Sequence, residues 1–288
     1  MTTLFDVLKK TYVDLGHMEI STATGGSTST LIDTKLGEKY GDGDTVGSTI
    51  FIIRDAGGLG AAPEAEVSYI TDYVSSTNTF SVSPSYSAAV GAGDRFGIAK
   101  NIIDIETMKE ITNDALQAFG TIQLTDTSIT TVTEQTEYSL PVLLKHRIDS
   151  VQISTNSTTG NREFNDIGGW YQINSAAGSV GMLVFNESLP AGETLKIFYS
   201  AEHPKLNAMT DVIAEVISSE LACKLIVDRA YQYQIRRTNG TDPFLLQTSN
   251  KAMQDVMEAR NRFSQPKHKR PKYLTPYNFR DTDFEDDD

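Results

Sequence analysis

The chain has 288 residues, a mass of 31.6 kDa, a formal net charge of −13 at pH 7 and a sequence pI of about 4.8. This length allows one large core or roughly two to three small ones, and the acidic balance excludes a surface that binds nucleic acid over its whole area. The single cysteine, Cys223, excludes an intramolecular disulfide, and no apolar run approaches the roughly 18 to 20 residues needed to cross a bilayer.

The N-terminal part of the chain predicts a short helix followed by a small β domain. Residues 1–15 place Leu4 and Leu8 on one side of a helix that Thr3 can cap. The same stretch lacks the basic-then-apolar pattern of a signal peptide, which indicates a protein kept in a cytosol-like setting. In residues 16–100, short β-type runs alternate with glycine-rich turns, which predicts an antiparallel barrel or sandwich.

Two stretches predict a helical core, residues 101–120 and residues 204–265. The first has apolar residues at helical spacing and ends at a glycine, a common helix stop. The second reads as a helical hairpin, because apolar residues recur every three or four positions from Leu206 onward. Its first helix is expected to start at a cap formed by Thr210 or Asp211.

The turn and the second helix of this hairpin are also marked. Asn239 and Gly240 predict a left-handed stop, Asp242 is a capping side chain, and Pro243 occupies the first helical position. Cys223 falls in the apolar part of the first helix and is predicted to be a buried small hydrophobe. The second helix is expected to bury one stripe and to end before the next proline. That stripe comprises Leu245, Ala252, Met253, Val256 and Phe263.

Residues 121–203 predict a β domain inserted between the helices. Its clearest strand alternates Leu195, Ile197 and Tyr199 with more polar residues, and residues 182–185 are expected to be its hairpin partner. Because the strongest helices flank this region, the simplest topology packs those helices together. The predicted fold class is α+β: a small helical bundle with an inserted antiparallel β domain, an N-terminal β-barrel or sandwich domain, and an extended C-terminal arm.

Residues 266–288 cannot make a core and predict an extended C-terminal arm. The arm is basic at its start, carries aromatic side chains among prolines in its middle, and is acidic at its end. Such a segment is disordered when free and can dock on a partner in an extended form. The candidate partner-binding residues are Lys267, Lys269, Arg270, Tyr273, Leu274, Tyr277 and Phe279.

The motifs of common catalytic sites are missing from the sequence. There is no phosphate-binding glycine loop, no zinc-protease motif and no nucleophile elbow, and the four histidines are scattered. His203 and Pro204 predict a turn into a helix. Asp42, Gly43 and Asp44 predict a turn rather than a metal loop, because no glutamate follows at the position that an EF-hand requires. We therefore expect no enzymatic activity, no cofactor and no metal.

Several short stretches together carry a resemblance to a known family. They are residues 115–120 (ALQAFG), 137–141 (EYSLP), Trp170, 181–185 (GMLVF) and 189–199 (LPAGETLKIFY), followed by the long helix. Between about residues 102 and 263, this arrangement of turns and strands resembles the adaptor, or head-completion, proteins of tailed bacteriophages. The N-terminal block 22–33 (TATGGSTSTLID) also resembles phage neck and tail sequences.

The resemblance implies a structural protein of the virion neck that is assembled in the cytoplasm of the host bacterium. Members of this family form a ring, usually of twelve copies, between the portal and further neck or tail proteins, around a DNA channel. The resemblance assigns residues 101–120 and 204–265 to the ring, and residues 266–288 to an arm that docks on the portal. A negative channel would let DNA pass without sequence-specific binding. The resemblance implies no membrane partner.

Two other classes of protein remain open. A tail, fibre or baseplate attachment protein would also combine β domains with helices, and would form a trimer or hexamer rather than a large ring. A carbohydrate-binding or carbohydrate-degrading module would need an aromatic platform or a close pair of carboxylates. Trp170 is most simply a core residue, so the sequence does not favour the carbohydrate module.

Overall fold

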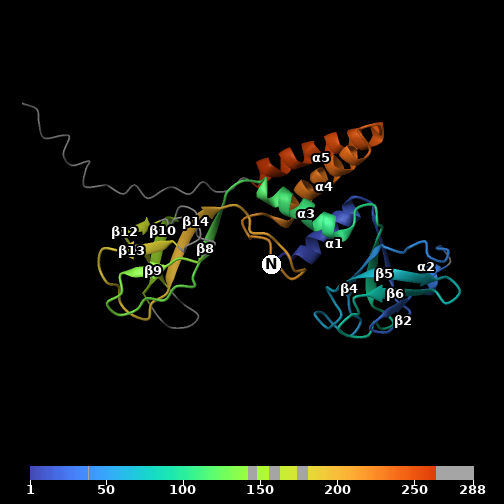
Figure 1. Ribbon diagram of the computed structural model, residues 1–288, viewed down its shortest axis with the longest axis horizontal. Coiled ribbons are helices and arrows are strands. Elements are labelled where there is room, and N and C mark those ends of the chain that lie inside the picture. The colour runs from blue at the N-terminus through green and yellow to red at the C-terminus, as the bar shows by residue number, and fades with distance from the viewer. Residues whose placement is uncertain (38, 142–147, 156–162, 174–180, 264–288) are drawn as a thin grey trace, which may run out of the picture. The chain divides into compact units, whose positions relative to one another are not determined.

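The computed structural model describes residues 1–37, 39–141, 148–155, 163–173 and 181–263 (Figure 1). Within these residues the chain forms five helices and three antiparallel sheets, so the fold class is α+β. Contacts divide the chain into two compact units, the first comprising residues 1–124 and 201–263, and the second comprising the described residues within 125–200. None of the helices in the described ranges is long and apolar enough to cross a membrane.

The first unit contains a seven-stranded antiparallel sheet. Its strands are β1 Met18–Thr22, β2 Gly25–Gly26, β3 Thr30–Ile32, β4 Thr49–Arg54, β5 Val67–Val74, β6 Thr79–Ser83 and β7 Arg95–Ala99, with the short helix α2 Thr34–Gly37 after β3. They lie in the order β1-β7-β4-β5-β6-β3-β2. Strand β4 is buried on both faces, because Ile50 and Ile52 pack in the core of the sheet whereas Phe51 packs among the helices.

Phe51 connects the sheet to the first helix, α1 Leu4–Asp14. Its ring centroid lies 5.5 Å from that of Phe5 and 5.7 Å from that of Tyr12, within the range of favourable aromatic pairs. The hydroxyl of Tyr12 is buried and donates a hydrogen bond to the carbonyl of Ile103 at 2.9 Å. A helix this short is marginal in isolation, so its stability comes from these contacts.

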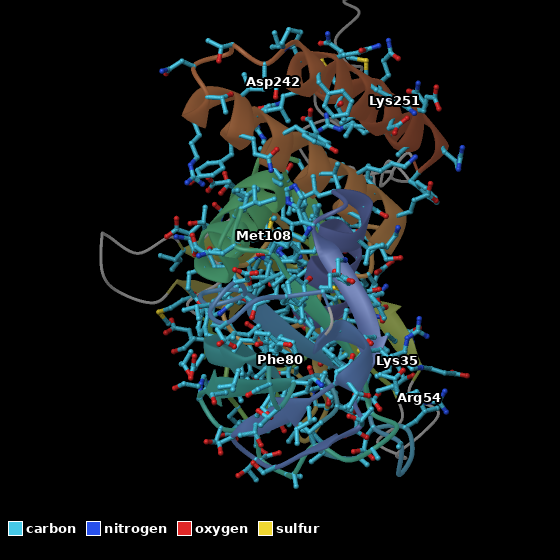
Figure 2. All side chains as sticks on the ribbon, turned by 90° about the vertical axis from the view of Figure 1, so that its right-hand side faces the viewer. Lys35, Arg54, Phe80, Met108, Asp242 and Lys251 are labelled. Carbon is cyan, nitrogen blue, oxygen red and sulfur yellow. The ribbon has the colours of Figure 1, made fainter. Side chains whose placement is uncertain are left out.

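The remaining helices pack around α4. They are α3 Ile105–Gln117, α4 Ser219–Arg237 and α5 Pro243–Arg262. Helix α4 contacts α1, α3 and α5, and lies side by side with α5 as a hairpin (Figure 1). The predictions for the start of α5 are confirmed, since Asp242 caps it and Pro243 is its first residue. Figure 2 labels one residue of each core of this unit, Phe80 in the sheet and Met108 among the helices.

The structure begins α4 at Ser219, so the prediction of a helix that starts near Leu206 is wrong for its first part. Residues 203–218, here called the strap, contain turns and no helix. Leu206, Ile213 and Ile217 are nevertheless buried, with 3%, 2% and 3% of their surfaces exposed. These residues are seven and four positions apart, which is helical spacing. Here that spacing results from contacts of an irregular segment with the core.

The strap stays irregular because its polar groups form other hydrogen bonds. The carboxylate of Asp211 accepts hydrogen bonds from the backbone amides four and three residues before it, at 2.6 and 2.9 Å. Neither Thr210 nor Asp211 therefore caps a helix that follows. The carbonyls of Asp211 and Met209 instead accept the amides of Leu4 and Phe5 at 2.8 and 3.1 Å. The strap thus satisfies orphan N–H groups in the first turn of α1.

The second unit, with its flanking residues, contains two sheets. The strands are β8 Ile122–Asp126, β9 Glu137–Ser139, β10 Ile148–Ser154, β11 Phe164–Asp166, β12 Trp170–Ile173, β13 Met182–Phe185 and β14 Leu195–Ala201. One sheet has the order β11-β10-β14-β8 and the other β12-β13-β9. The strand predicted at Leu195 is confirmed as β14, but its predicted hairpin with β13 is wrong. The connection between them bonds to Thr131, whose amide donates to Glu193 and whose carbonyl accepts from Gly192, so it closes no hairpin.

Candidate interaction surfaces on the helical hairpin

The seven residues predicted to bind the portal lie within residues 264–288, outside the part of the chain that the structure describes. The docking of this arm therefore stays a prediction. Among the described residues, α5 and the helices next to it carry an exposed apolar face and a pocket, the two features developed below.

His203 has a structural role. His203 is 2% exposed. Its Nε2 accepts the amide of Ala214 at 3.0 Å, which leaves Nδ1 to donate to the carbonyl of Pro204 at 2.7 Å. Burial lowers its pKa, as it does that of His17. His203 thus joins the start of the strap to Ala214 as a neutral ring, and the predicted turn from His203 into a helix is wrong.

The other candidate chemical groups are also accounted for by structure. Asp44 accepts the amide of Gly41 at 2.7 Å, which confirms a turn held by its own side chain, whereas Asp42 accepts the amide of the distant Ser75 at 2.6 Å. Cys223 is 1% exposed, as predicted, and burial raises the pKa of its thiol to about 11. Among the described residues, no group of three or more His, Cys, Asp and Glu side chains could hold a metal ion.

Helix α5 carries apolar residues on two different sides. The side facing the core consists of Ala252, Val256 and Ala259. A second set, here called the outer stripe, consists of Leu246, Met253 and Met257, which are 42%, 50% and 52% exposed. Their spacings of seven and four residues place them on one face of the helix. The prediction that Met253 belongs to the buried stripe is wrong, because it follows Ala252 by one residue and is turned about 100° around the helix.

The surroundings of the outer stripe carry little negative charge. The exposed residues Asn250, Gln254 and Asn261 beside it are neutral, and the exposed Arg260, three residues after Met257, adds a positive charge at its end. In a chain with a net charge of −13, most surfaces of two copies repel one another, and an apolar face with little negative charge does so least. The outer stripe is therefore the face of α5 best suited to contact another copy of the chain.

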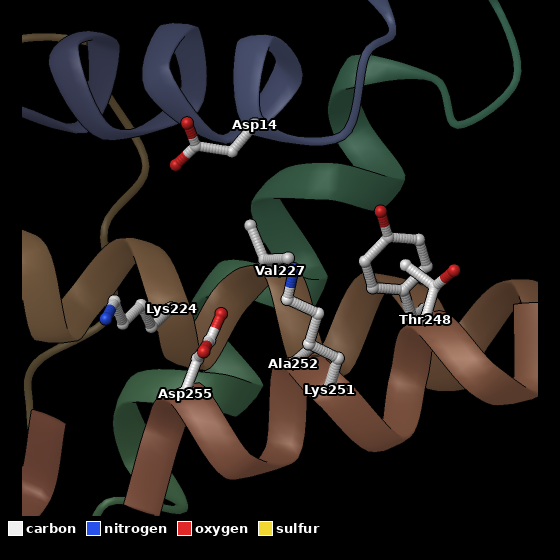
Figure 3. Close-up of a pocket in the computed structure, with 8 residues that line it drawn as sticks. Asp14, Lys224, Val227, Thr248, Lys251, Ala252 and Asp255 are labelled. Carbon is white, nitrogen blue, oxygen red and sulfur yellow. The ribbon is translucent and has the colours of Figure 1, made fainter. Parts of the chain in front are cut away.

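A pocket of about 340 Å³ lies where the C-terminal end of α1 meets α4 and α5 (Figure 3). We call it the hairpin pocket, and its lining consists of Asp14, Lys224, Val227, Tyr231, Thr248, Lys251, Ala252 and Asp255. Figure 3 shows Asp14 projecting from α1 toward the hairpin, and Lys251 projecting from α5 toward Val227. Val227 and the buried Ala252 provide apolar surface, so the pocket has an apolar interior with charged groups around it.

The formal charges of the hairpin pocket cancel, because two lysines and two aspartates line it. Lys224 and Asp14 each pair with a charged residue one turn away on their own helix, at 3.3 and 2.9 Å. Lys251 and Asp255 have no ion-pair partner among the described residues. Burial, and then the nearby Asp14, raise the pKa of Tyr231, so its hydroxyl stays neutral. The pocket therefore suits a neutral, largely apolar group.

Local sequence patterns indicated neither the hairpin pocket nor the outer stripe. The pocket joins Asp14 to Lys224, 210 residues further along the chain, and no local pattern indicates that proximity. The outer stripe could have been found from the one-residue step between Ala252 and Met253, which cannot share a helix face. A scan against models of known protein families finds no match to this chain, and a search of curated proteins finds none either.

Proposed function

We propose that the chain is a structural virion protein of a tailed bacteriophage, a neck adaptor that assembles into a ring between the portal and the tail. The observation that supports this proposal is the outer stripe of α5, an exposed apolar face on a long, well-capped helix. Helices that pack side by side around a ring need such a face in addition to the one that packs within the subunit. Helix α5 has both.

The strength of the contact follows from the exposed area. Full burial of a Leu or Met side chain is worth about 1.5 to 3 kcal/mol, so covering the exposed half of each residue of the outer stripe contributes about 1 kcal/mol apiece. A single such contact is weak once the entropy of association is subtracted. In a closed ring every copy makes two of these contacts, and linked contacts add avidity without a strong individual pair.

The finer architecture belongs to the same proposal. Residues 101–120 and 204–265 would form the helical bundle of the ring, with residues 121–203 inserted and residues 16–100 closing as a barrel or sandwich outside it. The arm at residues 266–288 would dock on the portal through its basic and aromatic residues. The ring, of about twelve copies as in the family it resembles, would line the DNA channel without sequence-specific binding, and this role needs no catalysis, cofactor or metal.

Electron microscopy of the purified full-length chain at high concentration tests this proposal. We expect rings with a central channel for the natural chain and for Gln254→Glu, which adds one charge beside the stripe. We expect Met253→Glu, which adds the same charge within the stripe, to form no ring while it keeps its normal helical content. A stable trimer or hexamer that is unchanged by Met253→Glu and by removal of residues 266–288 would favour a tail, fibre or baseplate attachment protein instead.

A further inference from the structure

Phe244 projects into solvent from the start of α5. Its surface is 72% exposed, so most of its apolar ring is available to a partner. Its backbone is fixed, because the carboxylate of Asp242 accepts the amides of Phe244 and Leu245 at 2.9 and 3.4 Å, and Pro243 precedes it. The exposed ring is thus attached to a fixed point of the backbone.

Phe244 lies on the same face of α5 as the hairpin pocket. Phe244, Thr248, Lys251 and Asp255 follow one another at steps of four, three and four residues, which is the spacing of one helix face. The last three of these line the pocket. Phe244 and the apolar Ala252 of the pocket are separated by eight residues, or about 12 Å along the helix axis. The exposed ring and the pocket are therefore neighbours on one surface. The ring of Phe244 is too far along the helix to enter the pocket of its own chain.

Two copies related by a twofold axis could place each exposed ring in the pocket of the other copy. In a twofold contact the same patch of both subunits is used, so a group of the first enters a site of the second and the reverse occurs at the same time. We propose that the hairpin pocket of each copy receives the Phe244 ring of a second copy of this chain. The contact is independent of the proposed ring, because it uses the face of α5 opposite the outer stripe.

Size and charge both favour this occupant. A cavity of about 150 Å³ in another protein is large enough to bind benzene, so a pocket of about 340 Å³ has room for a phenyl ring and part of its backbone. The pocket has no net formal charge, which disfavours the strongly acidic segments that a chain with a net charge of −13 offers elsewhere. An aromatic ring that leaves water for an apolar pocket is the type of group that dominates protein contacts.

Cysteine cross-linking tests the contact directly. Phe244→Cys and Ala252→Cys would be made in separate full-length chains, mixed and mildly oxidised. We expect a disulfide-linked dimer that contains one copy of each variant. The two positions cannot be joined within one chain, because a disulfide needs Cα atoms within about 7 Å. The natural Cys223 is 1% exposed and does not interfere. Met253→Cys on the outer stripe, mixed with Ala252→Cys, is the matched control and should remain uncoupled.

A second measurement reports the strength of the contact. In the Met253→Glu chain, which is expected to form no ring, sedimentation equilibrium should show that adding Phe244→Ala raises the dimer dissociation constant by about tenfold or more, while adding Phe244→Leu keeps most of the affinity. Circular dichroism should show both variants to be folded. The proposal is overturned if folded Phe244→Cys and Ala252→Cys form no mixed dimer, or if Phe244→Cys couples only to itself, which would mean that the two rings meet outside the pocket. The cross-linking result does not depend on the proposed ring, because substitutions in the outer stripe can abolish the ring without changing the hairpin pocket or Phe244.

Discussion

The strap is held at its start by the side chain of Asn113, and removal of that side chain should measurably destabilise the first unit. Its Nδ2 donates to the carbonyl of Leu206 at 2.9 Å, and its Oδ1 accepts the amide of the same residue at 2.7 Å. Leu206 is 3% exposed, so in Asn113→Ala its amide and carbonyl lose their partners where water enters poorly. Each hydrogen bond contributes about 1 kcal/mol, and Asn113 is half-buried, so the expected loss is about 2 kcal/mol.

Chemical denaturation followed by far-ultraviolet circular dichroism measures this loss, because all the described helices belong to the first unit. The fluorescence of Trp170, in the second unit, serves as an internal reference. Asn113→Asp keeps the acceptor but turns a second oxygen toward the carbonyl of Leu206, so it should destabilise at least as much. Asn261→Ala, at an exposed position on α5, should change the stability by less than about 0.5 kcal/mol. If Asn113→Ala also changes it by less than this amount, apolar packing alone holds the strap.

Further predictions concern single buried groups of the first unit. Tyr12→Phe keeps the ring contacts but loses the hydrogen bond to Ile103, so it should lower the free energy of unfolding by about 1 kcal/mol, whereas Tyr12→Ala should lower it by about 3 to 5 kcal/mol; equal losses would contradict the burial of the ring. Burial lowers the pKa values of His17 and His203 below the ordinary 6.5, so the folded state takes up these protons less readily than the unfolded state. Stability should be full above about pH 6.5 and should fall as the pH decreases below it, as measured by urea midpoints at about pH 7.5 and about pH 5.5; a flat profile would contradict this account. The thiol of Cys223 should react with a thiol reagent only in denaturant, and fast reaction of the native chain would show that α4 opens readily.

The helix ends that depend on local side chains could be predicted from the sequence. Asp242 and Pro243 mark the start of α5 correctly, because capping and the fixed φ of proline act within one turn. The spacing of Leu206, Ile213 and Ile217 wrongly predicts a helix in the strap. The backbone groups of the strap instead form tertiary hydrogen bonds with α1 and with Asn113. Periodicity reports burial, and it does not distinguish a helix from an irregular segment that is buried at similar intervals.

The contacts between distant segments could not be predicted from local patterns. The sequence favours Trp170 as a core residue, but the side chain is only partly buried and its indole donates to the carbonyl of Ile167 at 3.0 Å. Strand β13 pairs with β9 and β12 rather than with the strand that follows it, because the intervening residues bond to Thr131. The hairpin pocket likewise depends on the contact of α1 with α4, two helices that lie near opposite ends of the sequence. Each of these features is fixed by tertiary contacts that a single sequence does not encode locally.

The native mass of the full-length chain, measured over a range of concentrations beside Met253→Glu and Gln254→Glu, tests the central claim most directly. We expect the natural chain and Gln254→Glu to assemble into a closed ring whose mass is a multiple of 31.6 kDa, and Met253→Glu not to assemble beyond the Phe244 dimer. A natural chain that stays monomeric or dimeric at every concentration, or a ring that Met253→Glu leaves intact, would contradict the role of the outer stripe.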